Sequence, residues 1–167
     1  MPGEKRYKVL FLCTGNSARS IIAEYLLRKT DPRRFAAYSA GSNPRGEVHP
    51  LALRLLREVY KVDAGDARSK SWEEYLGVHF DFVITVCDTA RESCPYWPGQ
   101  PIVAHWGVTD PADFEGPEAE HYALFKEAGR VLARRIELFT NLPIEKLDRL
   151  RLEELTRGIG AEVQTEA

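Results

Sequence analysis

Cys13 stands directly after an unbroken apolar run, residues 9–12, and before small polar residues that end at Arg19. An apolar run of this kind is typical of a strand that is buried on both faces of a parallel sheet. Apolar residues at helical spacing come next, so we expect a helix to begin near Ser17 or Ala18. A strand, a tight loop and a helix N-terminus therefore meet within one short segment that contains a thiol and a guanidinium.

The loop between this strand and this helix suits an oxyanion. Successive backbone N–H groups of a short loop can converge on an anion, and the first turn of the helix adds unpaired donors. Gly15 allows the backbone to approach a ligand closely, and Arg19 carries a planar fork of donors that matches a tetrahedral anion. The same positive field favours a thiolate, so we expect Cys13 to be a nucleophile at neutral pH. The predicted oxyanion-binding residues are Thr14, Gly15, Asn16, Ser17, Ala18, Arg19 and Ser20.

A buried cysteine that merely ends a core strand is the alternative for Cys13, because free cysteines are among the most buried residues. The Cys-x5-Arg-Ser spacing coincides here with a strand, a loop and a helix, which favours the anion site. The segment CTGNSARS, residues 13–20, resembles the active-site loop of the low-molecular-weight protein tyrosine phosphatase superfamily. That superfamily also contains the thioredoxin-coupled arsenate reductases. The resemblance implies that Cys13 and Arg19 are catalytic residues.

The size and charge of the chain argue against several classes of protein. Its 167 residues are enough for one domain with a sizeable core. A net charge of −2 gives no global basic field for nucleic acid or an anionic membrane. Residues 1–5 lack the apolar core of a signal peptide, and no apolar run is long enough to span a membrane. Three cysteines without a secretory context favour reactive thiols over structural disulfides. We therefore expect a cytoplasmic protein without a nucleic-acid or membrane partner.

Further apolar patterns predict the rest of the fold. Strands are expected at residues 35–40, 80–87 and 102–106, and helices at residues 50–59, 72–76 and 117–139. This order implies an α/β fold, a single-domain open parallel four-stranded sheet with helices on both faces. Ligands of such sheets bind beyond the carboxyl ends of the strands, where Cys13 and Cys87 both fall.

The end of the chain lies outside the resemblance, which covers roughly residues 7–139. We divide the chain into a phosphatase-like domain, residues 1–141, and a C-terminal helical extension and tail, residues 142–167. Residues 144–157 are heavily charged, with leucines that predict a further helix lying on the body of the protein or on a partner. From about Gly158 we expect the chain to fray.

Cys87 and Cys94 enclose six residues. If the enclosed segment is helical, the two thiols lie about two turns, roughly 10 Å, apart, and a disulfide between them requires the segment to bend or unwind. A zinc site is disfavoured because the spacing is not the close one of zinc ligands and the four histidines are scattered. Two inert thiols remain an alternative. The pair resembles the redox pair of the thioredoxin-coupled arsenate reductases, which plain tyrosine phosphatases of the superfamily generally lack.

Asp110 lies in the loop after the strand predicted at residues 102–106 and directly before Pro111. A carboxyl group at this position can protonate the leaving oxygen of a bound anion. An Asp-Pro pair is, however, also common in loops that have no catalytic role. The segment HWGVTDPA resembles the general-acid loop of the reductase branch. Eukaryotic phosphatases of the superfamily carry tyrosines after Asp-Pro that grip the substrate ring, whereas this chain has Ala112 and Asp113.

No metal and no cofactor are expected. Some reductases of this branch have a potassium site near the loop, built partly from residues that match Asn16, Glu24 and Ser39. A further carboxylate is expected near position 70, where this chain has Lys70, whose ammonium can supply the positive charge itself. His49 precedes a predicted helix, and we interpret it as a polar residue at the helix entrance rather than a catalytic one.

The resemblance implies arsenate reduction as the leading hypothesis. Cys13 would attack arsenate, Asp110 would protonate the departing oxygen, and Cys87 and Cys94 would relay the oxidation to a disulfide that thioredoxin reduces. The second hypothesis is phosphatase activity on phosphotyrosine or aryl phosphates, with Cys13, Arg19 and Asp110 alone. The third is a non-enzymatic thiol redox sensor. The expected partners are arsenate or phosphate and thioredoxin.

Overall fold

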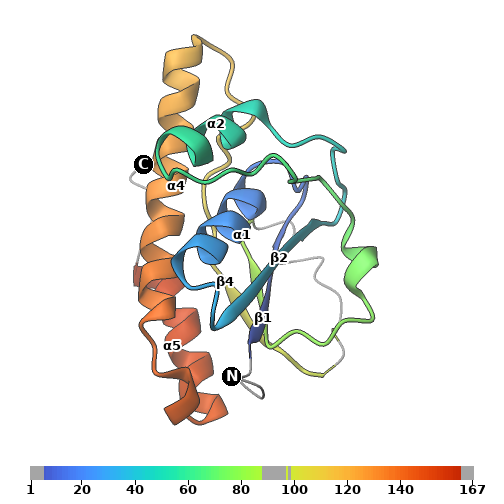
Figure 1. The fold of residues 1–167 in the computed structure, drawn as a ribbon, viewed down its shortest axis with the longest axis vertical. Coiled ribbons are helices and arrows are strands. Elements are labelled where there is room, and N and C mark those ends of the chain that lie inside the picture. Colours follow the sequence, from blue (N-terminus) through green and yellow to red (C-terminus); the bar gives the residue numbers. More distant parts are fainter. Residues whose placement is uncertain (1–5, 88–96, 98, 163–167) are drawn as a thin grey trace.

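A computed structural model describes residues 6–87, 97 and 99–162, and within them one parallel sheet of four strands. The strands are β1 (Tyr7–Cys13), β2 (Phe35–Gly41), β3 (Phe82–Thr85) and β4 (Ile102–His105), in the order β2-β1-β3-β4 (Figure 1). Cys13 pairs with Gly41, and Leu12 pairs with Thr85, so the carboxyl ends of the strands meet at one edge. The predicted α/β fold class is confirmed.

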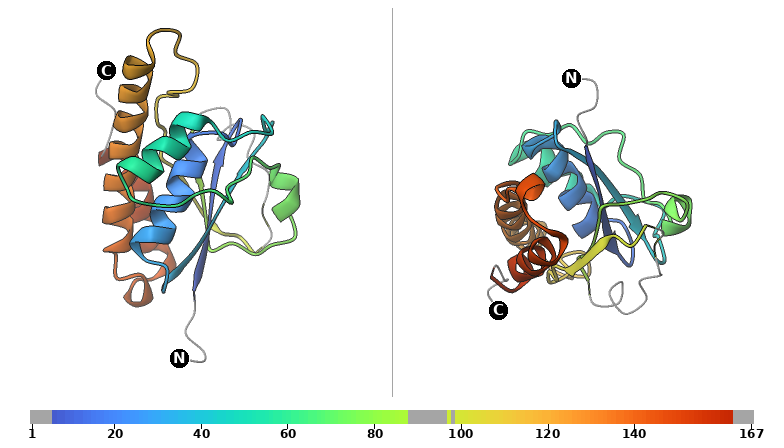
Figure 2. Two further views of the ribbon diagram at one scale, coloured as in Figure 1. Left: turned by 45° about the horizontal axis from the view of Figure 1, so that its top comes forward. Right: turned by 90° about the horizontal axis from the view of Figure 1, so that it is seen from below.

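The helices lie on both faces of this sheet. They are α1 (Arg19–Thr30), α2 (Pro50–Glu58), α4 (Glu118–Thr140) and α5 (Arg149–Glu162), with short 3-10 helices η1 (Trp72–Tyr75) and η2 (Ile144–Lys146). Helices α1, α4 and α5 cover one face, and the connection from β2 to β3 carries η1 across the other face (Figure 2). β2 lies on one side of β1, and β3 and β4 follow on the other side. The strand order therefore switches at β1, and the β1–α1 loop lies at the switch point where such folds bind ligands.

The core explains why β1 sits at the centre. Its last five residues are buried, as expected of a strand covered on both faces. Phe139 of α4 packs its ring against Phe35, Phe82 and Trp106, at centroid distances of 5.1, 4.9 and 5.6 Å. These contacts join the long helix to strands β2 and β3 and to the end of β4. The aromatic core therefore anchors α4 across the sheet.

The structure corrects four details of the predicted elements. The strand expected at residues 80–87 is only Phe82–Thr85, and the helix expected at residues 144–157 is the short η2 followed by α5. The helix expected at residues 50–59 ends at Glu58, and Val59, just past the helix end, is 45% exposed. Gly158 does not begin a frayed tail, because α5 continues to Glu162 and buries Ile159.

Candidate active site

The loop after β1 turns its carbonyl groups outward. Backbone N–H groups of the segment that follows β2 donate to the carbonyls of Cys13, Thr14, Gly15 and Ser17 at 2.9–3.3 Å; the donors are Ser42, Asn43, Arg45 and His49. In a trans peptide the carbonyl and the next N–H point in opposite directions. The N–H groups that follow these carbonyls therefore point away from that segment. Among the described residues, none accepts a hydrogen bond from the backbone N–H groups of residues 15–18.

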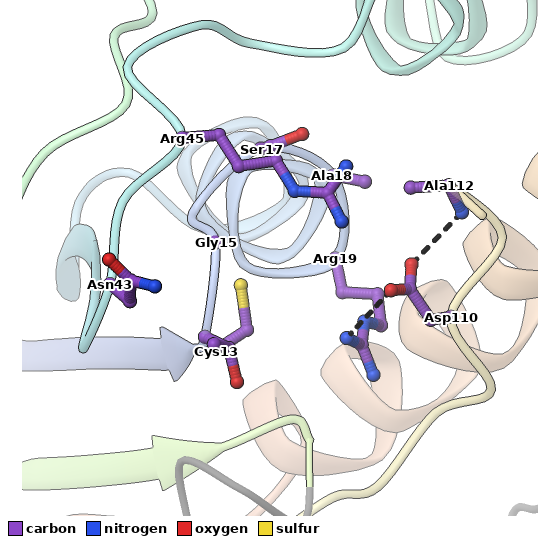
Figure 3. Close-up of a pocket in the computed structure, with 10 residues that line it drawn as sticks. Cys13, Gly15, Ser17, Ala18, Arg19, Asn43, Arg45, Asp110 and Ala112 are labelled. Carbon is purple, nitrogen blue, oxygen red and sulfur yellow. Dashed lines mark hydrogen bonds and ion pairs between the residues drawn. The ribbon is translucent and has the colours of Figure 1, made fainter.

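A cavity of about 220 Å³ lies at this loop (Figure 3). It is lined by Cys13, Thr14, Gly15, Ser17, Ala18, Arg19, Asn43, Arg45, Asp110 and Ala112. Five of the seven predicted oxyanion-binding residues after Cys13 are among them, whereas Asn16 and Ser20 lie behind the loop and do not line the cavity. The cavity thus combines free amide donors, a thiol, two guanidinium groups and a carboxyl group.

Arg19 and Asp110 meet at one side of the cavity. Arg19 is the first residue of α1, and its Nη2 lies 3.3 Å from Oδ2 of Asp110 (Figure 3). Its Nη1 donates to the carbonyl of Val108 at 2.8 Å. The backbone N–H of Ala112 donates to the other carboxyl oxygen of Asp110 at 2.9 Å. The carboxyl group is therefore oriented on both oxygens at the cavity that it shares with Cys13.

A chain of polar side chains supports Cys13 from below. Sγ of Cys13 lies 2.8 Å from Oγ of Ser20, which accepts a hydrogen bond from Nδ2 of Asn16 at 2.8 Å. Because Ser20 accepts from the amide, its own hydroxyl hydrogen is available to donate to the sulfur. Asn16 is fully buried and has φ of 43°, a left-handed conformation that asparagine tolerates better than most residues.

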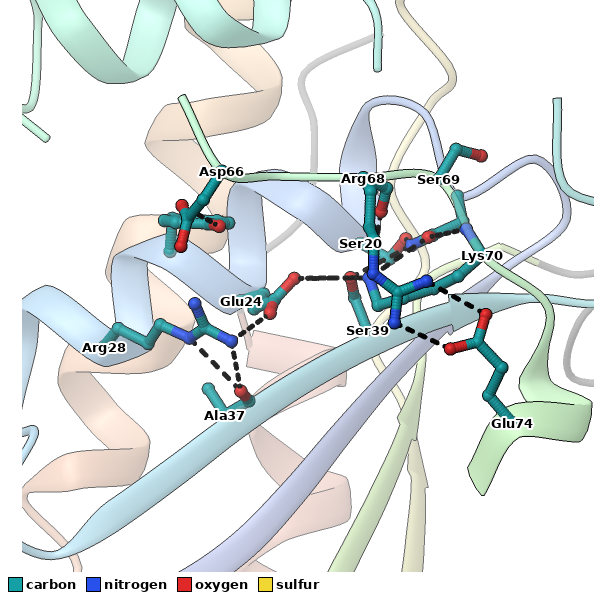
Figure 4. Close-up of polar contacts among 12 residues, drawn as sticks. Ser20, Glu24, Arg28, Ala37, Ser39, Asp66, Arg68, Ser69, Lys70 and Glu74 are labelled. Carbon is teal, nitrogen blue, oxygen red and sulfur yellow. Dashed lines mark hydrogen bonds and ion pairs between the residues drawn. The ribbon is translucent and has the colours of Figure 1, made fainter. Parts of the chain in front are cut away.

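Behind Asn16 lies a buried cluster of oppositely charged groups (Figure 4). Nζ of Lys70 donates to Oγ of Ser39 at 3.2 Å and lies 3.9 Å from Oε1 of Glu24, and both charged side chains are buried. The backbone N–H of Lys70 donates to Oδ1 of Asn16 at 2.9 Å, and its Nζ approaches the same atom at 3.5 Å. Arg28 forms a second ion pair with Glu24. The cluster fixes the amide of Asn16, which in turn fixes Ser20.

Burial opposes both charges of this cluster. It raises the pKa of Glu24, while Lys70, the hydroxyl of Ser39 and Arg28 lower it. Burial likewise lowers the pKa of Lys70, and Glu24 raises it. Each charge therefore offsets part of the cost of burying the other.

The same cluster does not fit the potassium ion that the resemblance suggests for some relatives. The ammonium of Lys70 already lies among the oxygens of Asn16, Ser39 and Glu24, and a second cation there would be repelled by it. In the part of the chain that the structure describes, no group of three or more His, Cys, Asp or Glu side chains is placed to hold a metal.

Cys87 lies against the anion loop. Its Sγ accepts a hydrogen bond from the backbone N–H of Thr14 at 3.2 Å and lies 3.3 Å from the hydroxyl oxygen of Thr14. Both Cys87 and Cys13 are buried free thiols. The structure thus brings the second predicted cysteine to the residue next to the first. Cys94 lies outside the described residues.

Two histidines connect the loops around the cavity. His121 of α4 donates from Nε2 to the carbonyl of Pro111 at 2.7 Å, which ties the Asp110 loop to the long helix. His49 caps α2, where its Nδ1 accepts from the N–H of Leu51 at 3.1 Å, so its position at the helix entrance is confirmed. Burial lowers the pKa of His49, and the neighbouring His121 and Arg45 lower it further, so this side chain is neutral at neutral pH.

Sequence patterns did not single out Asn43, Arg45 or Ala112 as cavity residues. Asn43 and Arg45 follow β2, whose carboxyl end lies beside that of β1, and this adjacency is the signal that could have predicted them. Ala112 follows the predicted Asp-Pro pair. Arg45 also pairs with the exposed Asp113 at 3.1 Å, across the mouth of the cavity.

A parallel sheet with a Cys-x5-Arg loop and a facing aspartate defines a cysteine-dependent phosphatase-like site. The family model "Low molecular weight phosphotyrosine protein phosphatase" matches residues 8–149, and the chain belongs to this family. An arsenate reductase from Oceanobacillus iheyensis is 35% identical over 131 residues, which cover 78% of this chain and 93% of that protein. An arsenate reductase from Bacillus subtilis is 33% identical over the same length, with the same coverage.

Solved structures give the same picture. One described as an arsenate reductase in the phosphate binding state is 27% identical, with a TM-score of 0.65, and the match covers 78% of this chain and 94% of that one. A thioredoxin-dependent arsenate reductase from Corynebacterium glutamicum is 31% identical, with a TM-score of 0.58, and the match covers 81% of this chain and 64% of that one. Within the described residues, no helix is long and apolar enough to cross a membrane.

Proposed function

We propose that this protein is an arsenate reductase that uses thioredoxin as its reductant. The observation that carries the proposal is the contact of Cys87 Sγ with Thr14, the residue next to Cys13, at the edge of the anion cavity. A phosphatase needs a single nucleophilic thiol, whereas reduction of an oxyanion needs a second thiol that can reach the first. The names of the arsenate reductases to which the chain is similar support the same reaction.

In the first step of the proposed reaction, the Cys13 thiolate attacks the arsenic of arsenate held by the loop amides and Arg19. A sulfur–arsenic bond forms, and one arsenate oxygen leaves as water after Asp110 donates a proton to it. The arrangement of Asp110, with Arg19 on one carboxyl oxygen and Ala112 on the other, supports this assignment.

In the second step, the Cys87 thiolate attacks Sγ of Cys13. The sulfur–arsenic bond breaks, and its electron pair remains on arsenic, so that arsenate is reduced to arsenite while Cys13 and Cys87 are oxidised to a disulfide. Cys94 then attacks Cys87, releases Cys13 as a thiolate and leaves a Cys87–Cys94 disulfide, which thioredoxin reduces.

Oxidation of NADPH that depends on arsenate, in the presence of thioredoxin and thioredoxin reductase, tests this proposal. Wild-type protein is expected to turn over, and both Cys13→Ser and Cys87→Ser are expected to be inactive. Cys87→Ser keeps a hydroxyl at the contact with Thr14, so its inactivity would not result from a cavity. If Cys87→Ser retains arsenate turnover, the disulfide relay is wrong.

Phosphatase activity is the second candidate, because the Arg19–Asp110 pair beside Cys13 is sufficient for transfer of a phosphoryl group. Hydrolysis of p-nitrophenyl phosphate separates the two functions, since a phosphatase loses this activity in Cys13→Ser and retains it in Cys87→Ser. If neither assay depends on Cys13, both enzymatic functions fail and a redox sensor becomes the better hypothesis.

A further inference from the structure

The last helix, α5, lies beyond the part of the chain that matches the family. The match ends at residue 149, where α5 begins. The helix lies beside α4 and packs on β4, the edge strand of the sheet (Figures 1 and 2). Leu152 and Ile159 of α5 are buried, and Nε of Arg157 donates to the carbonyl of Val103 in β4 at 3.1 Å.

The backbone of α5 comes close to the sheet at Gly160. A Cβ atom at this position would lie 2.2 Å from the carbonyl oxygen of His105 and 3.0 Å from Cδ1 of Trp106. Contacts that short do not occur, so the backbone of α5 rests directly on the end of β4 because residue 160 has no side chain. One turn earlier, Thr156 accepts a hydrogen bond on its carbonyl from Nε1 of Trp106 at 3.0 Å.

A buried guanidinium extends this contact into the next residue. Arg135 of α4 is 1% exposed, and it donates from Nη1 to the carbonyl of Gly107 at 3.0 Å and from Nη2 to the carbonyl of Gly160 at 3.4 Å. Burial lowers the pKa of Arg135 to about 10, so the side chain remains charged at neutral pH. Arg135 therefore links α5 to the loop that leaves β4.

The same loop leads to the candidate general acid. Trp106 is held by Thr156, Gly107 by Arg135, and Val108 by Nη1 of Arg19. Three consecutive residues are thus fixed by three different helices. Asp110 follows two residues later and contacts Arg19.

We propose that α5 is a positioning element for Asp110, acting through Thr156 and Gly160 on the Trp106–Gly107 segment. The proposal rests on the proposed function, in which Asp110 donates the proton. If α5 merely covered apolar surface, a change in its seating would lower stability without a specific effect on the step that uses Asp110.

A pair of glycines in α5 gives a matched test. Gly160→Ala introduces a methyl group against the carbonyl of His105, whereas Gly158→Ala introduces the same group where nothing lies within 4 Å. Each variant is made with Asp110 and with Asp110→Asn, and kcat/KM for arsenate is measured in the thioredoxin-coupled assay. The melting temperature of each protein is recorded, together with inhibition by inorganic phosphate as a measure of anion binding.

With Asp110 present, Gly160→Ala is expected to lower kcat/KM about tenfold or more, because a small misplacement of a catalytic group is costly. In the Asp110→Asn protein the same change is expected to lower it less than about twofold, since the group that it misplaces is already lost. Gly158→Ala is expected to leave kcat/KM unchanged in both backgrounds. Equal losses in both backgrounds, or no loss in either, would overturn the proposal.

Trp106→Phe provides a second route if Gly160→Ala does not fold. It removes the indole N–H that donates to Thr156 together with part of the buried ring, and it keeps an aromatic ring in the core. Trp106→Phe is likewise expected to lower kcat/KM in the protein that retains Asp110 and not in the Asp110→Asn protein. If wild-type protein does not reduce arsenate, the proposed function fails, and the same comparison is made with p-nitrophenyl phosphate, whose hydrolysis uses the same acid.

Discussion

The buried pair of Lys70 and Glu24 gives the most informative prediction on stability. Lys70→Met keeps most of the side-chain volume and removes the ammonium that lies 3.9 Å from Oε1 of Glu24. Loss of one partner from a buried ion pair typically costs about 3–5 kcal/mol, because the other charge is left in a medium of low polarity. Glu24 keeps its contacts with Arg28 and Ser39, so the expected loss is at the lower end, about 3 kcal/mol.

The loss is expected to depend on pH in a defined direction. Burial raises the pKa of Glu24, and removal of Lys70, the largest influence that lowers it, raises it further. A carboxyl group whose pKa is raised in the folded state destabilises the protein when ionised, and this penalty disappears as the group is protonated. The difference between Lys70→Met and wild type is therefore expected to be largest near pH 8 and to shrink toward about pH 5.

Urea unfolding at several pH values measures this effect. The double variant Lys70→Met/Glu24→Gln is expected to recover most of the loss, with a coupling energy of about 2 kcal/mol. Lys146→Met, which removes an exposed ammonium, is expected to change stability by less than about 0.5 kcal/mol. The reasoning is refuted if Lys70→Met is as stable as wild type at pH 8, or if its destabilisation is the same at pH 5 and pH 8.

Three further predictions concern single residues. Asp110→Asn is expected to lower kcat/KM for arsenate about 100-fold or more with little change in phosphate inhibition, since it removes the proton donor; equal activity would exclude the role. His49→Asn keeps a helix cap that does not titrate. Because His49 gains a proton between about pH 7 and pH 5, wild type should lose stability over this range, and the variant should lose less. Urea unfolding at both pH values measures the difference. Phe139→Ala is expected to cost about 3–5 kcal/mol in urea unfolding, because its ring contacts three others in the core; a loss below about 1 kcal/mol would contradict this packing.

The sequence predicts the cavity loop because its chemistry is contiguous. Cys13, Gly15 and Arg19 are near one another in the chain, and a buried strand followed by a helical pattern leaves few ways to arrange them. A parallel sheet of four strands follows from the same patterns. The role of Asp110 could be predicted only from the resemblance, because an Asp-Pro pair alone does not indicate a catalytic acid.

Residues whose role depends on distant partners could not be predicted in this way. Arg135 resembles any charged residue on a long helix, yet it is buried because carbonyls of Gly107 and Gly160 accept from it. Gly160 resembles a residue of a fraying tail, whereas its missing side chain allows α5 to touch β4. Such close approaches are properties of packing and leave no periodic signal in the sequence.

A single turnover without reductant tests the central claim most directly. Reduced protein is mixed with one equivalent of arsenate, alkylated after quenching and digested, and the thiols are located by mass spectrometry while arsenite is quantified. The account predicts about one arsenite per protein molecule, a disulfide that joins Cys87 to Cys94, and an alkylated Cys13. Three alkylated cysteines and no arsenite would contradict it.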